Sequence, residues 1–144
     1  MRLAALCATI HPMNWNLTGH EWAVHMLGRQ IAAGEMRHAY LFTGPPGVGK
    51  RTLALQFAKA LNCSQPPAPG EYCGVCRICA GIEKKQQADL TIVQAEQEGG
   101  GLKVEPMREL LRSLSLAPFE ARYRVALLLR FHEATTAAQN ALLK

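Results

Sequence analysis

A glycine-rich run in the first half of the sequence has the composition of a loop that binds phosphate. The run consists of Gly44, Pro45, Pro46, Gly47, Val48, Gly49, Lys50, Arg51 and Thr52. In such loops, glycines let successive backbone N–H groups surround the phosphates, a lysine reaches the terminal phosphate oxygens, and a Ser or Thr hydroxyl binds Mg²⁺. Gly44, Gly49 and Lys50 keep the required spacing, so the run predicts a nucleotide-binding site.

The same run departs from an ATP-hydrolysing site at one position. Arg51 stands where a hydroxyl residue should follow the lysine. A guanidinium carries only hydrogen-bond donors and cannot ligate a metal cation. The sequence therefore predicts a loop that can hold ATP or another phosphate but lacks its usual Mg²⁺ ligand.

Four cysteines near the middle of the chain form a second group with metal chemistry. They are Cys63, Cys73, Cys76 and Cys79. Four thiolates complete a tetrahedral Zn²⁺ site and leave no open position for a substrate, so we expect a structural zinc that pins an insertion at residues 63–79. Reduced, unliganded cysteines or a redox pair are the alternative. Cys7 is left over, and we expect an inert thiol there.

A phosphate loop of this kind needs a strand before it and a helix after it. Ala39–Thr43 is a short, apolar, β-prone run that ends at the loop, and it predicts the strand. Leu53, Phe57 and Leu61 recur at helical spacing after the loop, and they predict the helix. The order of strand, loop and helix is the context that the loop requires.

Strands and helices alternate along the rest of the chain. We expect further helices at residues 21–33, from Pro106 onward and from about Thr136 to the end, and further strands at residues 90–95 and 123–129. The last strand is apolar almost continuously, as a parallel strand covered on both faces is. The alternation predicts an α/β fold with a mainly parallel sheet.

Composition sets broader limits on the fold and function. The 144 residues fit one domain, and a hydrophobic content of 49% is enough for a core. No apolar run approaches the roughly 20 residues that a membrane helix needs. The net charge of +5 permits polyanionic partners without requiring them.

The first residues of the chain are predicted to lie outside the domain. We expect residues 1–14 to be a disordered N-terminal extension. A short secretory signal is the alternative, which Pro12 disfavours. The cysteines further along suit a reducing compartment, so we expect a cytoplasmic protein.

Several stretches that are spread over the chain occur together in one known family. They are Gly19–Glu21, His38–Tyr40, Gly44–Thr52, Ala58–Cys63 with its three further cysteines, and Asn140–Lys144. Together they resemble the N-terminal AAA+ domain of bacterial DNA polymerase III clamp-loader subunits. The resemblance covers residues 15–144 and implies a P-loop NTPase fold of three layers, αβα, with a zinc-binding insertion. It also implies a chain truncated on its C-terminal side, where a lid and a collar domain would follow.

The resemblance has implications for activity. The motor subunit of the family, gamma/tau, carries a hydroxyl residue after the loop lysine and an Asp-Glu pair at the end of the third strand, where this chain has Arg51, Leu129 and Arg130. These departures resemble delta-prime, a stator subunit with a degenerate ATPase site. We therefore expect no catalytic residues here. We expect a role in ATP-dependent loading of the sliding clamp onto primed DNA, beside gamma/tau and delta in the DNA-directed DNA polymerase (nucleotidyltransferase) complex.

The residues themselves support the loss of hydrolysis. ATP hydrolysis needs a carboxylate at the end of the strand to hold Mg²⁺ and a second to orient water. Glu133 is the first acidic residue after the strand, four positions beyond Leu129, and aligning it with the strand end would misplace Asn140–Lys144. The strand end therefore supplies neither carboxylate.

Two other functions stay open. One is an active gamma/tau-like ATPase motor of the same fold, and the other is a zinc-stabilised nucleic-acid-binding protein with a vestigial loop. Arg108 and Arg112 lie one helical turn apart and are candidate DNA contacts, because phosphate contacts of this kind are independent of base sequence. The alternative for this pair is a solvated helix face. His20 and His38 are expected to form hydrogen bonds rather than to catalyse.

Overall fold

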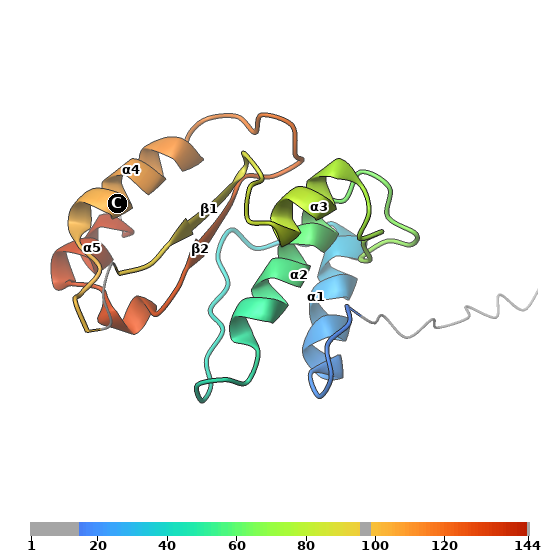
Figure 1. Ribbon diagram of the computed structural model, residues 1–144, viewed down its shortest axis with the longest axis horizontal. Helices are drawn as coiled ribbons and strands as arrows, with labels where there is room; N and C mark the ends of the chain where they lie inside the picture. The colour runs from blue at the N-terminus through green and yellow to red at the C-terminus, as the bar shows by residue number, and fades with distance from the viewer. Residues whose placement is uncertain (1–14, 96–98, 144) are drawn as a thin grey trace, which may run out of the picture.

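The computed structural model describes residues 15–95 and 99–143 of the chain. The extension predicted for residues 1–14, with Cys7, lies outside the described residues. The elements are α1 (Glu21–Ala33), α2 (Lys50–Asn62), α3 (Arg77–Glu83), β1 (Leu90–Val93), α4 (Val104–Leu114), β2 (Val125–Leu128), the 3₁₀ helix η1 (Phe131–Glu133) and α5 (Thr136–Ala141) (Figure 1). The predicted α/β class is confirmed. None of the described helices is long and apolar enough to cross a membrane.

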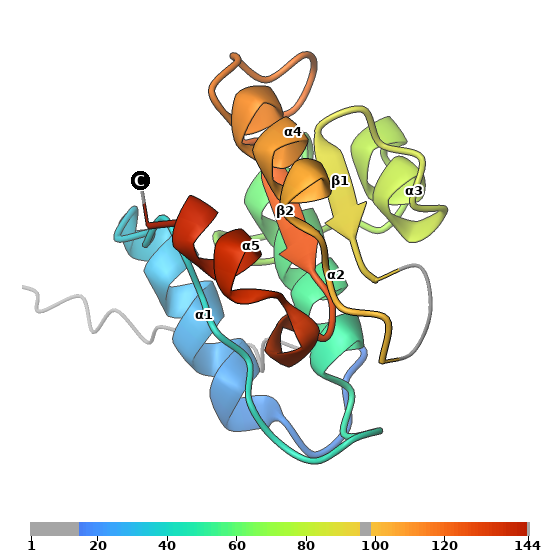
Figure 2. The same ribbon diagram turned by 90° about the vertical axis from the view of Figure 1, so that its left-hand side faces the viewer.

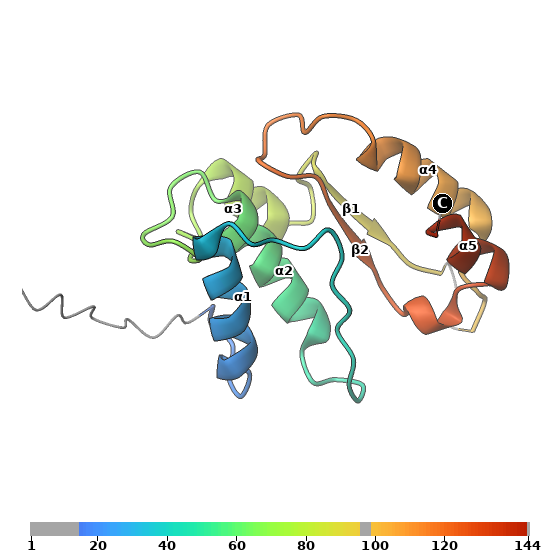
Figure 3. The same ribbon diagram turned by 180° about the vertical axis from the view of Figure 1, so that it is seen from behind.

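The sheet consists of two parallel strands joined through helix α4. Leu90 pairs with Val125 at one end of the ladder and Val93 with Leu128 at the other. Helix α4 packs on both strands and on α5, and Figures 1 and 3 show α4 and α5 on one side of the sheet and α2 on the other. Helix α3 lies beside β1 (Figure 2). The predicted parallel pairing is therefore confirmed for these two strands.

Side chains of β2 alternate between two hydrophobic clusters. Ala126 and Leu128 pack into a cluster centred on Met107 of α4, and Val125 packs on Ile82 of α3. All four residues of β2 are only half-buried. Hydrophobic clusters therefore lie on both faces of β2, as the sequence predicts, but among the described residues they bury the strand only in part.

The strand predicted at Ala39–Thr43 does not form. This segment has no assigned strand structure, and Leu41 in its centre is 80% exposed. A strand satisfies its N–H and C=O groups through a neighbouring strand. Among the described residues, β1 and β2 pair only with each other, so the apolar run before the phosphate loop is not part of their ladder.

Helices α1 and α2 pack side by side around an aromatic core (Figure 1). Trp15 stacks on Phe57 of α2 with ring centroids 6.1 Å apart, and Leu27 of α1 is completely buried in the same cluster. Helix α1 ends at Gly34, whose φ of 71° lies in the left-handed region that favours glycine. The predicted bounds of α1 are confirmed, as is the helix after the loop.

Asn62 ties the end of α2 to the segment that enters β2. Its side-chain amide donates to the Tyr123 carbonyl at 3.1 Å, and its amide oxygen accepts from the Tyr123 N–H at 2.8 Å. Both backbone groups of Tyr123 are thus satisfied by one buried side chain. This pair of hydrogen bonds fixes the helical part of the molecule against the sheet.

Asp89 holds the loop that leads from α4 to β2. Its carboxylate, 1% exposed, accepts from the backbone N–H groups of Phe119, Glu120 and Ala121 at 2.6–2.9 Å, and the Arg124 guanidinium lies 3.6 Å away. Burial alone would raise the pKa of Asp89, but the three N–H donors and the arginine outweigh it and lower the pKa. The charged carboxylate is therefore the form that the fold stabilises.

Replacing Asp89 with asparagine should lower the free energy of unfolding by about 2–3 kcal/mol near pH 7, because the amide cannot accept from all three donors. The folded pKa lies below the unfolded one. Asp89 therefore stabilises the fold fully above the unfolded pKa of about 4, and this contribution is lost as the pH falls through the folded value. Urea unfolding of wild type and Asp89→Asn should show the difference in stability shrinking between about pH 7 and pH 3.

Glu109→Gln is the matched control, because Glu109 is exposed on α4. Its effect should stay within about 0.5 kcal/mol. An Asp89→Asn deficit that is unchanged at low pH would contradict the assignment.

Candidate nucleotide loop and metal centre

The phosphate loop adopts backbone conformations that its glycines make accessible. Gly47 and Gly49 have φ values of 79° and 88°, in the left-handed region where a β-carbon is strained. Helix α2 begins directly after Gly49, and no side chain caps its first turn. The uncapped N–H groups at the start of a helix favour an anion. The loop geometry therefore suits a phosphate.

The Lys50 side chain folds back onto its own loop. Its ammonium donates to the carbonyls of Gly44 and Pro45, at 2.6 Å in each case. The Lys50 ammonium therefore lies over the loop, at the place where we expect the phosphate oxygens of a bound nucleotide. These two bonds to neutral carbonyls are weaker than bonds to a charged phosphate, so a phosphate can replace them.

His20, the residue before helix α1, contacts the phosphate loop. Its Nε2 forms a hydrogen bond with the Val48 carbonyl in the middle of the loop. This contact confirms the prediction that His20 forms a hydrogen bond. It joins the residue before α1 to the loop before α2, so both helices begin at the candidate nucleotide site.

The structure places the residues that stand at the positions predicted for Mg²⁺ and water binding. Arg51 and Thr52 are exposed in the first turn of α2. Leu129 follows β2 and donates its N–H to the Val93 carbonyl at 2.8 Å, so it lies at the carboxyl end of the strand. Arg130 comes next with a φ of 51°. The side chains of Leu129 and Arg130 offer no oxygen ligand for Mg²⁺.

The nearest acidic residue after β2 belongs to a different local structure. Glu133 lies in η1, and its carboxylate is 3.6 Å from the Arg130 Nε and 3.9 Å from the His132 Nε2. Its carbonyl accepts from the Leu102 N–H at 2.9 Å. Glu133 therefore pairs with neighbouring side chains and anchors the segment before α4.

The four predicted cysteines come together. The sulfur atoms of Cys63, Cys73, Cys76 and Cys79 all lie within 4.8 Å of one another, and Cys79 is completely buried. Tetrahedral Zn²⁺ with bonds of about 2.3 Å places its sulfurs about 3.8 Å apart. The Cys63 and Cys73 sulfurs are 3.5 Å apart. The cluster can hold a metal ion and is consistent with a structural zinc site.

Backbone N–H groups point at three of the sulfurs. The Cys73 amide donates to Cys63 Sγ at 3.3 Å, the Cys76 amide to Cys73 Sγ at 3.3 Å, and the Cys79 amide to Cys76 Sγ at 3.4 Å. The last of these bonds also caps α3, a helix that the sequence analysis did not predict. N–H donors stabilise thiolates, which are the form that binds metals.

The thiols differ in how easily they ionise. Burial raises the pKa of Cys63 and of Cys79. Burial acts in the same direction on Cys76, but hydrogen bonds from Ser64 and from the Cys79 amide outweigh it and lower the pKa to about 6. The Cys76 amide lowers the pKa of Cys73. Cys76 therefore ionises most easily among the four thiols, and a bound cation would favour the thiolate form of all four.

The cysteine insertion is held beside α1 by hydrogen bonds between residues that are far apart in the sequence. Trp15 donates its indole N–H to the Gly70 carbonyl at 3.0 Å, and the Tyr72 hydroxyl donates to the Trp15 carbonyl at 3.1 Å. A β-carbon on Gly70 would lie 2.3 Å from the Gly28 carbonyl oxygen. Glycine is therefore required at position 70 for the insertion to approach α1.

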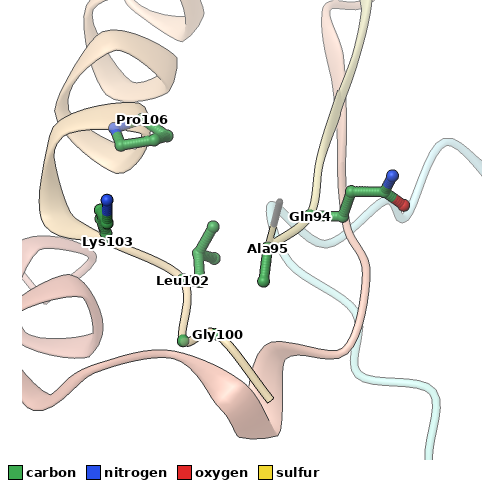
Figure 4. Close-up of a pocket in the computed structure, with 7 residues that line it drawn as sticks. Gln94, Ala95, Gly100, Leu102, Lys103 and Pro106 are labelled. Atoms are coloured by element: carbon green, nitrogen blue, oxygen red, sulfur yellow. The ribbon is translucent and has the colours of Figure 1, made fainter. Parts of the chain in front are cut away.

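The remaining candidate residues are not gathered into a site. Arg108 and Arg112 are exposed on α4, and Arg108 pairs with Glu105 at 2.8 Å. A shallow pocket of about 210 Å³ lies between the end of β1 and the start of α4 (Figure 4). Among the residues that the structure describes, Lys103 is the only charged one that lines it, and none of the predicted site residues does.

Comparison with known proteins gives consistent matches. Residues 19–144 match the family described as DNA polymerase III, delta subunit. The chain is 38% identical over 128 residues to DNA polymerase III subunit gamma/tau of Mycobacterium tuberculosis, covering 89% of this chain and 22% of the relative. It is 36% identical over 129 residues to subunit tau of Escherichia coli, covering 90% and 19%. It is 32% identical over 145 residues to subunit tau of Bacillus subtilis, covering 100% and 25%. The chain thus spans about a fifth to a quarter of the length of these curated relatives.

The purified, reduced protein should contain about one zinc ion per chain, and Cys76→Ser should lose it and loosen the insertion. Elemental analysis measures the zinc, and limited proteolysis around residues 63–79 measures the loosening. Cys7→Ser should keep the metal. Reduced protein without zinc, or a disulfide between Cys73 and Cys76, would refute the metal assignment.

Proposed function

The chain belongs to the DNA polymerase III clamp-loader subunit family, and we propose on that basis that it works as such a subunit in loading the sliding clamp onto primed DNA. One structural observation supports the proposal in addition to family membership. Helix α2 begins at the phosphate loop and ends at Cys63 of the cysteine cluster. The chain therefore joins a nucleotide-type loop and a metal-type cluster through a single helix.

Within the clamp-loader family, this chain can be compared with two types of subunit, gamma/tau and delta-prime. The three relatives named above are gamma/tau or tau subunits, and their names favour a gamma/tau-like protein over the delta-prime assignment. Three residues of this chain favour a delta-prime-like stator instead. We propose that its own ATP site is degenerate, because Arg51, Leu129 and Arg130 replace the Mg²⁺ hydroxyl and both carboxylates.

An active gamma/tau-like motor is the second candidate. The sequence identity supports it, and so does the intact Lys50, whose ammonium can reach a phosphate from its position over the loop. Hydrolysis would then require Mg²⁺ to be held without the usual protein ligands. Nucleotide binding without hydrolysis fits the observed residues better, because the loop amides and Lys50 are sufficient for it.

A zinc-stabilised nucleic-acid-binding protein is the weakest candidate. Arg108 is engaged by Glu105, and the exposed face of α4 mixes both signs of charge. An independent DNA site would need a wider basic surface. We propose that DNA is contacted through the assembled complex, with Arg108 and Arg112 as the residues of this chain that could reach it.

We also propose a domain organisation for residues 15–144. Residues 15–144 would form part of an AAA+ P-loop domain of three layers, with a structural zinc in the insertion at 63–79. The lid and collar domains would be supplied by the polypeptide beyond this region. The helices on either side of the β1–β2 sheet support this organisation. The proposed partners are gamma/tau, delta, the sliding clamp and primed DNA.

Clamp loading with purified components tests the function. The full-length polypeptide, mixed with the other clamp-loader subunits of its source, should be required for ATP-dependent transfer of the clamp onto primed DNA. Equal clamp loading in its absence would refute the role. Strong DNA binding by the protein alone, without association with any of these subunits, would favour the third candidate instead.

Restoring the missing Mg²⁺ ligands should make the ATP affinity depend on Mg²⁺. Because Arg51 places a positive charge where the cation belongs, the triple variant Arg51→Thr, Leu129→Asp, Arg130→Glu should bind ATP at least about tenfold more tightly with Mg²⁺ than without it, a difference of about 1.4 kcal/mol. Wild type should show no such dependence. Calorimetric titration with and without Mg²⁺ measures both, and Lys50→Ala is the control for binding at the loop. Wild-type binding that already depends on Mg²⁺ would favour the motor.

A further inference from the structure

An ion pair joins α2 and α3, and each of its members lies four residues from a cysteine ligand. Lys59 lies four residues before Cys63, at the end of α2, and Glu83 lies four residues after Cys79, in α3. Residues four apart share a face of a helix. Helices α2 and α3 pack directly on each other. Lys59 and Glu83 form a salt bridge between them, so the ion pair and the sulfur cluster occupy the same interface.

The two members of the pair have very different environments. Lys59 is 5% exposed, and its ammonium lies 5.3 Å from the centre of the Tyr72 ring, next to Cys73 in the chain. The Glu83 side chain is 68% exposed. A buried ammonium needs compensating negative charge, and an exposed carboxylate is screened by water. Glu83 alone is a weak partner for a cation as buried as Lys59.

The cysteine cluster supplies further negative charge when it holds a metal. Four thiolates and one Zn²⁺ carry a net charge of −2, and this charge develops at the interface that contains Lys59. Groups that surround a metal site without touching the ion orient the ligands and tune affinity. The Lys59 carbonyl also accepts from the Cys63 N–H at 2.8 Å, so the residue fixes the backbone of a ligand.

We propose that Lys59 is a positioning residue of the metal site, which balances the charge of the metal-bound thiolates and holds α2 and α3 at the separation that the four sulfurs require. The proposal rests on zinc as the ion of the cluster. It assigns Lys59 a role different from that of Glu83. Loss of Lys59 removes a positive charge beside the cluster, whereas loss of Glu83 removes a negative one.

Zinc affinity separates this role from a purely structural salt bridge. Competition with a chromogenic chelator on the full-length protein should show that Lys59→Met weakens zinc binding by about 10–100-fold. Lys59→Arg, which keeps the charge, should restore affinity to near that of wild type. Glu83→Gln should bind zinc at least as tightly as wild type. Lys84→Met, which removes a neighbouring exposed lysine, is the matched control and should change the affinity by less than about twofold.

Several results would overturn the proposal. Unchanged zinc affinity in Lys59→Met would remove the charge-balancing role. Equal losses in Lys59→Met and Glu83→Gln would reduce Lys59 to one half of a salt bridge. If Lys59→Met does not fold, the zinc affinity of Glu83→Gln decides alone. A tenfold loss of zinc affinity in Glu83→Gln contradicts the proposal, and an affinity equal to or higher than that of wild type supports it. Absence of zinc from wild type would overturn the metal assignment and this proposal together, and the wild-type titration identifies that case.

Discussion

Helix α2 connects the two candidate sites and packs against both neighbouring helices. Its first residue, Lys50, belongs to the phosphate loop, and the residue that follows its last turn is Cys63. Its length of about 20 Å fixes the separation of the two candidate sites. Phe57 and Ala60 pack in the core shared with α1, and Ala58 packs on α3. A change in the angle of this helix would therefore move the loop, the cluster and both neighbouring helices.

Buried polar side chains connect this helical part to the sheet. Asn62 satisfies both backbone groups of Tyr123, and Asp89 gathers three backbone N–H groups of the loop before β2. The described sheet has two strands, which pack against the helices through two hydrophobic clusters. Satisfied buried polar groups specify one arrangement where apolar packing alone would allow several. These two residues therefore give the small sheet its place beside α2.

The sequence predicted the parts of the fold that depend on local patterns. The bounds of α1 followed from helical periodicity and Gly34, and the cysteine cluster followed from the spacing of four thiols. Prediction failed where a distant partner decides the outcome. Ala39–Thr43 has the composition of a strand but finds no strand to pair with among the described residues. Helix α3 is short, and its cap is the sulfur of Cys76, a residue type that is not a usual helix cap in sequence patterns. Lys59, Asn62 and Asp89 act through residues 24 or more positions away, which no periodic pattern reveals.

The central claim is that the phosphate loop is retained without the means to hydrolyse ATP. Phosphate release by the full-length protein, measured with clamp, primed DNA, ATP and Mg²⁺ and compared with Lys50→Ala, tests it most directly. We expect wild type to release no more phosphate than Lys50→Ala, because the side chains of Arg51, Leu129 and Arg130 can neither hold the metal nor orient the attacking water. Turnover of about 1 s⁻¹ or more, in the ordinary range of enzymes, that is abolished by Lys50→Ala would contradict it and identify the chain as part of an active motor.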